Sequence, residues 1–488
     1  MPFLADDIVA LRRDDGSSIQ YFWGDEVEIV ASDASAQRVR VIGVNGPIDE
    51  GRISLKAELS DRSVLKMSMI DVQQGDGMII ETPGGKVIFI DGGDNQLFAR
   101  HAAARFRGTS EANPLPVDLI LVTHGDADHF DGLNELQKSE SDERARKRIF
   151  VAPRRFYHNG IVKRPGKTAA GAERKETEML GATTKVGDVL LVTGLVDDPA
   201  SVPLGDRNRP FNNWVATLAA WDQRTTALTG SPIERRRIDQ TSTDAFDFLA
   251  DENIRVDLIG PISEPTPAGP GLRFLGTPPD DANLMLGTVE SGEGSSPSAS
   301  HTINGHSIAL RLQIGNVRFL LTGDLNQESG RRLRETLPNT SLRCEILKAP
   351  HHGSADFDME FLKEAGPVVS LVSSGDESAA KEYIHPRATL MAALGKASRT
   401  TPAIIFVTEL AAFFKVIGYV NDGDGRRFFA FERTNFGIAH IRTDGERVLA
   451  FTHSGKEGMN EAYRFAVSTT GEVRFAAKAV KRAAPKKL

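Results

Sequence analysis

The sequence predicts an α/β sandwich with functional loops at the ends of its strands. Three short apolar runs, at 66–71, 77–81 and 86–90, are separated by turn residues, as expected of consecutive strands. A helical stretch around 97–106 then leads into a buried strand at 118–122. Strands that feed helices in this order are typical of an α/β sandwich. The loops that connect such elements are where functional residues usually gather.

Length and composition limit the class of protein. A chain of 488 residues is too long for one ordinary domain, so we expect a large catalytic domain with smaller additions. Apolar residues make up 40% and charged residues 26%, which excludes collagen-like and wholly disordered chains. The apolar runs are far shorter than the roughly 20 residues of a membrane helix, so we expect no membrane span. Residues 1–15 lack the apolar core of a secretory signal, and the single Cys344 gives no support to an oxidising compartment, so we expect a cytoplasmic protein.

The pattern of turns and apolar runs divides the chain into four expected parts. These are a small β-barrel at 1–62, a main domain at 63–405 with an insertion at 140–300, a C-terminal β-rich extension at 406–475, and a basic disordered tail at 476–488.

The first part consists of short alternating runs separated by Gly, Asn and Asp. Gly24-Asp25-Glu26-Val27 opens one strand, and Glu50-Gly51-Arg52-Ile53 lies near the end of the segment. With these cues the segment resembles bacterial SH3-like modules. That resemblance implies a peptide or protein ligand for the module.

The strongest chemical signal lies directly after the expected strand at 118–122. His124, Asp126, Asp128 and His129 place four potential metal ligands within six residues. Imidazole and carboxylate together suit Zn²⁺, Mn²⁺ or Fe²⁺. The alternative is a solvated acidic turn, since Asp and Gly are common in loops.

Two later apolar strands also end in residues that can bind metals. Residues 319–323 lead directly into Asp324, and residues 346–350 lead into His351 and His352. Random placement of polar residues would not repeat this pattern, which favours a metal site over a solvated turn.

These residues, with other short motifs, resemble the metallo-β-lactamase superfamily and, within it, the ComEC-like branch that contains the hydrolase domain of a bacterial competence DNA-uptake protein. The matching stretches are Asp71-Val72-Gln73-Gln74-Gly75-Asp76, Ile90-Asp91-Gly92-Gly93, Thr123 to His129, Leu321 to Leu325, Pro350 to Ser354, and His385-Pro386. The resemblance covers roughly residues 64 to 390. It implies a four-layer αββα sandwich that holds two divalent metal ions, Zn or Mn.

The resemblance also implies which residues bind each ion. His124 and Asp126 would hold the first metal, Asp128 and His129 the second, and Asp324 would bridge both. The superfamily's ordinary motif is His-x-His-x-Asp-His, and Asp126 replaces the second histidine here. This departure, which the ComEC-like branch shares, gives the first ion a harder ligand.

For the remaining metal ligands the resemblance offers competing candidates. His352 would complete the second site, with His351 as the competing choice. The family usually supplies one more ligand to the first site just before the strand that leads to the bridging Asp. His306 stands in this region, with His301 as a less favoured substitute.

A metal pair of this kind lowers the pKa of a bridging water and so provides a hydroxide nucleophile near neutral pH. Asp128 would bind metal and would also orient that water. Lys348, Ser354, Ser373 and Ser374 lie at expected strand ends and are candidates for contacts to an oxyanion, with ordinary surface or turn roles as the alternative.

Further polar residues have supporting roles in this interpretation. His385 would line the substrate pocket or bind metal, or it would be a structural histidine beside a proline turn. Asp71, Asp76 and Asp91 are expected to form turns or to orient histidines, because a metal-binding histidine needs a partner for its other ring nitrogen.

The substrate class is suggested by a local excess of positive charge. The net charge is −7, yet residues 144–167 contain nine basic residues and no acidic one. Such a run can bind a phosphate backbone, and its alternative is a solvated helix face. The candidates for substrate binding within it are Arg154, Arg155, Lys163 and Arg164.

Three functions are therefore compared. The first is a two-metal nuclease or phosphodiesterase that acts on DNA or RNA. The second is a hydrolase of a small phosphate ester or another ester. The third is a catalytically inactive binding or sensor module that keeps the fold, which the intact set of ligand residues disfavours.

Overall fold

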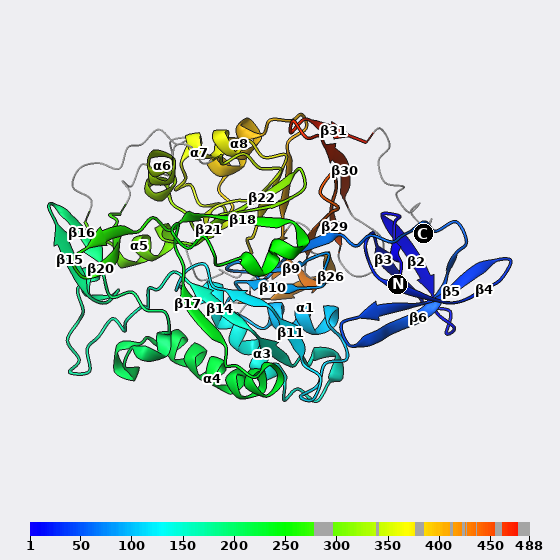
Figure 1. Ribbon diagram of the computed structural model, residues 1–488, viewed down its shortest axis with the longest axis horizontal. Coiled ribbons are helices and arrows are strands. Elements are labelled where there is room, and N and C mark those ends of the chain that lie inside the picture. Colours follow the sequence, from blue (N-terminus) through cyan, green and yellow to red (C-terminus); the bar gives the residue numbers. More distant parts are fainter. Residues whose placement is uncertain are drawn as a thin grey trace.

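Two large sheets form the centre of the computed structural model (Figure 1). The structure describes residues 1–277, 296–337, 341–375, 385–409, 413–421, 425, 427–435, 437–453 and 461–476. The first sheet has, in spatial order, the strands β17 (Glu234–Arg237), β14 (Arg155–His158), β12 (Leu119–Leu121), β10 (Val87–Ile90), β9 (Met78–Glu81), β8 (Leu65–Ile70), β28 (Ile438–Thr443), β29 (Arg447–His453), β30 (Ala462–Val467) and β31 (Val473–Phe475). The second has β18 (Ile254–Gly260), β21 (Ala309–Ile314), β22 (Val317–Leu321), β23 (Ile346–Lys348), β24 (Val369–Val372) and β25 (Ile404–Val407).

The two sheets pack face to face through apolar side chains. Met67, Ile90 and Leu121 of the first sheet belong to the same buried cluster as Leu310 and Phe319 of the second. Central strands such as β10 are buried at every position, which explains why they are continuous apolar runs rather than alternating ones. The inner two layers of the molecule are therefore both sheets.

Helices cover the outer face of each sheet (Figure 1). The ten-stranded sheet is covered by α1 (Leu97–Arg105), α3 (Asn134–Ser139) and α4 (Arg209–Thr229), and the six-stranded sheet by α6 (Gln327–Thr336), α7 (Met359–Ala365) and α8 (Ala388–Ala397). Together with the two sheets they make four layers in the order helix, sheet, sheet, helix. The α/β class expected from the sequence is confirmed.

Helix α4 shows how local sequence sets these outer layers. Asn208 caps its first turn by accepting a hydrogen bond from the backbone N–H of Phe211 at 3.1 Å, and Gly230 ends it at φ +81°. Trp214 and Trp221 lie on its buried face, 1% and 0% exposed. Truncating a buried aromatic residue to Ala costs about 3–5 kcal/mol, so this stripe holds α4 on the sheet.

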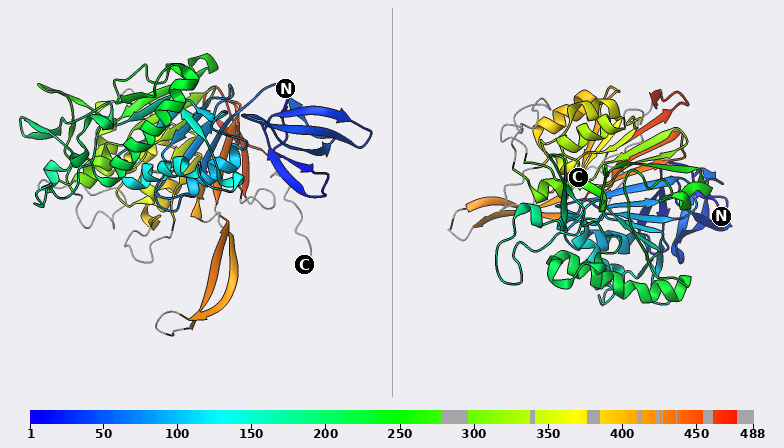
Figure 2. Two further views of the ribbon diagram at one scale, coloured as in Figure 1. Left: turned by 90° about the horizontal axis from the view of Figure 1, so that it is seen from below. Right: turned by 60° about the vertical axis from the view of Figure 1, so that its left-hand side comes forward.

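Shorter elements join these layers. The short helices are α2 (Ala127–Phe130) and α5 (Ala299–Gly305), and the 3₁₀ turns are η1 (Asp131–Leu133), η2 (Ala145–Lys147), η3 (Glu176–Glu178), η4 (Pro199–Ser201), η5 (Leu204–Asp206), η6 (Asp247–Glu252) and η8 (His351–Gly353). A four-stranded sheet contains β15 (Thr183–Val186), β16 (Val189–Val192), β20 (Gly269–Arg273) and β19 (Glu264–Thr266), and a pair contains β11 (Leu115–Val117) and β13 (Val151–Pro153). The hairpin of β26 (Phe413–Asn421) and β27 (Arg427–Asn435) projects from the body of the protein (Figure 2).

The N-terminal residues form a separate antiparallel sheet beside the two large ones (Figure 1). Its strands are β3 (Ser18–Phe22), β2 (Ile8–Arg12), β6 (Gly46–Ser54), β5 (Ala36–Gly43) and β4 (Val27–Ser32), while β1 (Phe3–Leu4) pairs with β7 (Leu59–Ser60). Phe22 and Trp23 pack against Leu449 and Phe451 of β29. The SH3-like barrel and its peptide ligand stay predictions.

The other expected parts of the chain are placed as follows. Within the insertion at 140–300, β14, β17 and β18 belong to the two large sheets. In the C-terminal extension, β28 to β31 continue the ten-stranded sheet beyond β8. The domain boundaries stay predictions, and residues 477–488 of the expected disordered tail lie outside the described residues. Of the helices in the described ranges, none combines the length and apolar character needed to span a membrane.

Parallel pairing brings the ligand candidates to one edge of the sandwich. Strand β10 is parallel to β12, and β22, β23 and β24 are parallel to one another. The carboxyl ends of parallel strands meet at the same edge of a sheet, where ligands usually bind. The residues that follow these ends are Asp91 after β10, the loop 123–129 after β12, Asp324 after β22, and His351 and His352 after β23.

Candidate metal centre

Three buried side chains converge on one point at this edge. His129 Nε2 lies 3.2 Å from His352 Nε2 and 3.3 Å from Asp324 Oδ2, and His352 Nε2 lies 3.0 Å from the same oxygen. Ligands bound tetrahedrally to Zn²⁺ at about 2.0–2.1 Å lie about 3.3 Å from one another. Asp128 Oδ2 is 3.7 Å from His352 Nε2. These four residues therefore fit a divalent cation.

The second ring nitrogen of each of these two histidines contacts a carboxylate. His129 Nδ1 is 2.8 Å from Asp91 Oδ2, and His352 Nδ1 is 3.3 Å from Asp76 Oδ1. Both histidines therefore direct Nε2 at the common point and Nδ1 at a carboxylate, which is the usual support of metal-binding histidines. Asp76 and Asp91 thus lie where an orienting role places them, and Asp76 is also close enough to His129, Asp324 and His352 to belong to the metal cluster itself. Asp71 instead forms a turn, because it accepts hydrogen bonds from the backbone and side chain of Gln73.

The electrostatics of the cluster also favour a bound cation. Burial alone lowers the pKa of His352, but Asp324 and Asp76 outweigh it and raise the pKa to about 9. Burial likewise opposes charge on Asp324, yet His352 and His129 hold its pKa well below the ordinary value. In the protein alone, the imidazoles carry the positive charge that the carboxylates require. A metal ion supplies the same charge at the same place.

The backbone at the centre adopts conformations that most residues avoid. His351 and His352 have φ values of +47° and +51°, and Asp91 has +56°. Left-handed backbone at residues other than glycine costs of order 1–3 kcal/mol and gathers at functional sites. Here this backbone conformation directs the adjacent side chains of His351 and His352, in η8, towards the cluster.

Gly75 allows the closest backbone contact at the site. Its φ is +97°, and a Cβ atom would lie 1.6 Å from the carbonyl oxygen of Asp128. We expect Gly75→Ala to displace Asp128, to cost more than the roughly 1–3 kcal/mol of the backbone strain alone, and to lower metal content. Chemical denaturation and elemental analysis would measure both effects.

Gly205→Ala is the matched control for this substitution. A Cβ atom at Gly205 would meet nothing within 4 Å, and its φ is not in the left-handed region. We expect this variant to remain within about 0.5 kcal/mol of the parent protein. Equal stability and metal content in Gly75→Ala and Gly205→Ala would show that the contact with Asp128 is not needed.

His124 and Asp126, the residues expected at a first metal site, lie close to the cluster but have other partners. His124 Nε2 lies 4.0 Å from Asp324 Oδ2, and His124 is buried. Asp126 Oδ1 instead accepts a hydrogen bond from Lys163 Nζ at 2.5 Å. His351 Nε2 lies 3.8 Å from Asp324 Oδ2, the oxygen that His129 and His352 also contact. It is therefore a further nitrogen near the cluster. His352, rather than His351, makes the closer contact with Asp324.

His306 does not join the cluster, which corrects its assignment as a metal ligand. Its Nε2 lies 2.7 Å from the carbonyl oxygen of Arg273, so the imidazole is directed at β20. The next residue, Ser307, faces the site instead, with its hydroxyl 3.2 Å from His124 Nδ1. The substitute His301 lies near Asp356, at 3.6 Å.

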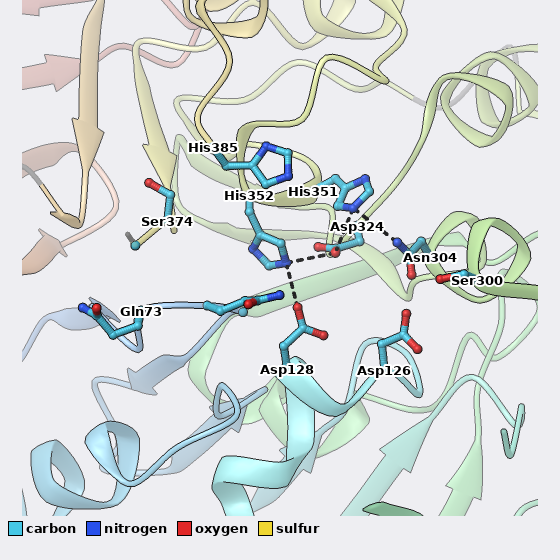
Figure 3. Close-up of a pocket in the computed structure, with 13 residues that line it drawn as sticks. Gln73, Asp126, Asp128, Ser300, Asn304, Asp324, His351, His352, Ser374 and His385 are labelled. Carbon is cyan, nitrogen blue, oxygen red and sulfur yellow. Dashed lines mark hydrogen bonds and ion pairs between the residues drawn. The ribbon is translucent and has the colours of Figure 1, made fainter. Parts of the chain in front are cut away.

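A polar pocket of about 150 Å³ opens onto the cluster (Figure 3). Its lining consists of Gln73, Gln74, Gly75, Asp126, Asp128, Ser300, Asn304, Asp324, His351, His352, Ser374, Gly375 and His385. Ser374, a candidate for oxyanion contact, and His385, a candidate for pocket lining or metal binding, both line this pocket, and their roles stay predictions. Burial lowers the pKa of His385 to about 4, so its imidazole is neutral at pH 7.

Sequence reasoning missed part of this pocket. Asn304 lies 3.3 Å from His351 Nε2, and with its amide nitrogen directed at Asp126 it donates to Oδ2 at 2.9 Å. Ser300 is on the same short helix, α5. The sequence offered one signal for these two residues. Ser300 and Asn304 are one helical turn apart in a segment just before β21.

Three other expected substrate contacts are corrected by the structure. Lys348 is 0% exposed, and its Nζ forms an ion pair with Asp76 and donates to the carbonyl of Gly323 at 2.8 Å. Ser373 is buried and donates to the carbonyl of Gly75 at 2.7 Å. Ser354 accepts from the backbone N–H of Asp356 at 3.2 Å. These side chains hold the loops around the pocket and do not line it.

The basic residues on either side of β14 lie at two different edges of the sheet. Arg155 begins β14, and β14 is parallel to β12 with Phe156 beside Ile120. Arg154 and Arg155 therefore lie at the edge opposite the metal centre, and Arg154 Nε is 3.9 Å from Asp118. Lys163 follows the other end of β14 and reaches the pocket.

These positions correct the substrate-binding roles expected for Arg154 and Arg155. Arg164 is half-buried, and its backbone N–H donates to the carbonyl of Met179 at 2.8 Å. Its side chain does not line the pocket. Of the four basic candidates, Lys163 alone contacts a pocket residue in the described part of the chain.

Comparison with known proteins gives one family match and similar proteins over parts of the chain. Residues 70–170 match the metallo-beta-lactamase superfamily. ComE operon protein 3 of Bacillus subtilis is 29% identical over 111 residues, which are 22% of this chain and 13% of that protein. The metallo-beta-lactamase fold protein YhfI of Bacillus subtilis aligns with 70% of this chain and 97% of its own, at 9% identity and a TM-score of 0.27.

The matched residues 70–170 contain the loop with His124, Asp126, Asp128 and His129, together with the orienting residues Asp76 and Asp91. This match over residues 70–170 and the buried cluster of His and Asp support a metal-dependent hydrolase of the metallo-beta-lactamase type, and the chain is similar to ComE operon protein 3 over part of its length.

Proposed function

We propose that this protein is a metal-dependent phosphodiesterase, most simply a nuclease that acts on DNA or RNA. The observation that carries the proposal is the convergence of His129, His352 and Asp324 on one point beside an open polar pocket. The similarity to ComE operon protein 3 and to competence DNA-uptake hydrolases favours a phosphodiester over other substrates of the superfamily.

The residues that would hold metal follow from the distances. Asp128, His129, Asp324 and His352 would bind one Zn or Mn ion. A second ion beside His124 and Asp126 would require Asp126 to exchange Lys163 for metal. A bound divalent ion of this kind lowers the pKa of water and stabilises negative charge on the attacked group.

The pocket residues supply the remaining requirements of hydrolysis. Asp128 is 22% exposed on the pocket wall, so its carboxylate can orient an attacking water and accept its proton. Ser374 and His385 line the same space and can donate hydrogen bonds to a phosphoryl oxygen. Lys163 adds positive charge at the rim. A pocket of about 150 Å³ takes a phosphate group while the rest of a large substrate lies outside.

One observation favours a second candidate, a hydrolase of small phosphate esters. Arg154 and Arg155 lie at the far edge of the sheet, so no continuous basic track is formed by the expected residues. A nuclease needs such contacts along the nucleic-acid backbone. A small ester needs only the pocket.

Substrate preference and metal content together test the proposal. Metal-loaded protein would be incubated with single-stranded DNA, RNA, plasmid and bis-p-nitrophenyl phosphate in Zn²⁺ and in Mn²⁺. We expect cleavage of a nucleic acid, and we expect Asp128→Ala to lower the rate by about 10²–10⁴-fold, the usual contribution of general acid–base catalysis. Elemental analysis would count the ions bound per chain.

Asp188→Ala is the control, because Asp188 is an exposed aspartate outside the pocket. It should keep the parent rate. Cleavage of the small ester alone would replace the nuclease proposal with the second candidate. Absence of hydrolysis in a metal-loaded, folded protein would favour the binding or sensor module.

A further inference from the structure

A second cavity lies between the N-terminal module and the ten-stranded sheet. Its volume is about 820 Å³, within the range of about 300–1,000 Å³ typical of small-molecule sites. Its walls come from β3 of the module, from β8 and β28 of the sheet, and from α1. It shares no lining residue with the pocket at the metal centre.

The sheet face inside this cavity is polar where an apolar face is expected. Lys66 pairs with Arg442 across β8 and β28, and Ser68 pairs with His440. The opposite face of the same strands, at residues such as Met69 and Ile441, packs into the core between the sheets. A face covered by other elements is normally apolar. The polar side chains of these two residue pairs therefore suggest that the cavity binds a ligand.

Positive charge exceeds negative charge at the centre of the cavity. Lys66, Arg105 and Arg442 share one carboxylate, Asp25, at 3.7, 3.6 and 3.1 Å. Glu81 pairs with Arg105 at 2.6 Å. Three cations thus face two carboxylates, and their side chains are only 13%, 26% and 6% exposed. Charge that is largely withdrawn from water without a full set of partners is costly, so the site favours one more anion.

The surrounding rings indicate that the ligand is organic rather than a bare ion. His101, His440 and His453 line the cavity, and burial, together with the nearby Arg105, lowers the pKa of His101 to about 4. A neutral imidazole offers both a donor and an acceptor. The His440 ring stacks on Phe451 at 4.9 Å between centroids. Ile19 and Ile48 add an apolar wall.

We propose that this cavity binds a small organic anion of nucleotide size, whose phosphate or carboxylate groups pair with Lys66, Arg105 and Arg442. Arginine and lysine are the side chains that recognise both anions, and guanidinium does so with paired hydrogen bonds. The volume and the imidazole faces leave space for a ring or another apolar body. The proposal goes beyond hydrolysis at the metal centre and does not rest on it.

Isothermal titration calorimetry of the full chain tests this site. The probes are inorganic phosphate, citrate and adenosine monophosphate, which separate a bare ion, a carboxylate and a phosphate that carries a ring. We expect citrate or adenosine monophosphate to bind more tightly than inorganic phosphate. Lys66→Met should weaken that binding at least tenfold. Arg107→Gln, at an exposed lining residue where folding is not at risk, should weaken it and reduce its salt dependence.

Two variants serve as controls for the titration. Lys138→Met removes an exposed lysine outside the cavity and should leave binding unchanged. Asp128→Ala alters only the metal pocket and should also leave binding unchanged. Lack of binding by all three probes would overturn the proposal. So would parent-like binding in both Lys66→Met and Arg107→Gln, or loss of binding in Asp128→Ala.

Discussion

Replacing Asp324 with Asn is expected to abolish turnover and to lower metal content. The Asp324 side chain is 3% exposed, and its Oδ2 lies 3.0 and 3.3 Å from the Nε2 atoms of His352 and His129. His351 and His124 contact the same oxygen at 3.8 and 4.0 Å. Asparagine keeps the shape of this side chain but removes the negative charge that a cation needs.

The expected loss follows from what the metal contributes. A bound metal supplies several kcal/mol of charge stabilisation, so we expect a fall of at least about 10³-fold, or ~4 kcal/mol. The rate of phosphodiester hydrolysis and elemental analysis measure the two effects. Circular dichroism would show that the fold persists.

Asp356→Asn provides a matched control for Asp324→Asn. Asp356 is also buried and lies 3.6 Å from a histidine, His301, but it accepts a hydrogen bond from the backbone N–H of Gln327 and stands outside the cluster. We expect it to retain metal and most of the parent rate. A metal-loaded, active Asp324→Asn protein would remove this carboxylate from the centre.

Much of the site was predictable because its residues follow directly from strand ends. The loop with Asp128 and His129 comes after one apolar run, and Asp324 and His352 come after two others. The carboxyl ends of parallel strands share an edge, so convergence requires only that these runs be strands of parallel sheets. The same reasoning places Asp91 at this edge, because it directly follows β10.

Other residues could not be placed because their environment depends on distant parts of the chain. His306 and Ser307 are adjacent, and the end of α5 decides which of them faces the site. Arg154 and Lys163 lie at opposite ends of β14, and only the parallel pairing with β12 shows that one is far from the pocket. Sequence spacing alone does not contain these long-range contacts.

Lys348 is the residue whose role changes most between sequence and structure, since it was expected to contact substrate. It ends β23, a strand that is buried at every position, and its Nζ contacts Asp76, the carbonyl of Gly323 and, at 3.6 Å, Asp324. Burial lowers the pKa of a lysine, but Asp76 and Asp324 outweigh it and raise the pKa of Lys348. The ammonium group therefore remains charged and balances two buried carboxylates.

Lys348→Met is accordingly expected to destabilise the fold rather than to change substrate affinity alone. Removing one partner of a buried ion pair costs about 3–5 kcal/mol, because the other charge is left without compensation. Urea denaturation of the metal-free protein measures this loss. Lys138→Met, at a lysine whose side chain is 61% exposed, should remain within about 0.5 kcal/mol of the parent protein.

A double-mutant cycle then distinguishes charge balance from simple packing. Asp76→Asn removes the negative partner, so combining it with Lys348→Met leaves one buried charge fewer than Lys348→Met alone. We expect a coupling free energy of about 0.5–3 kcal/mol, with the double variant more stable than the sum of the single losses predicts. Additive losses would mean that Lys348 and Asp76 act independently. Unchanged stability with a raised KM would restore Lys348 as a substrate contact.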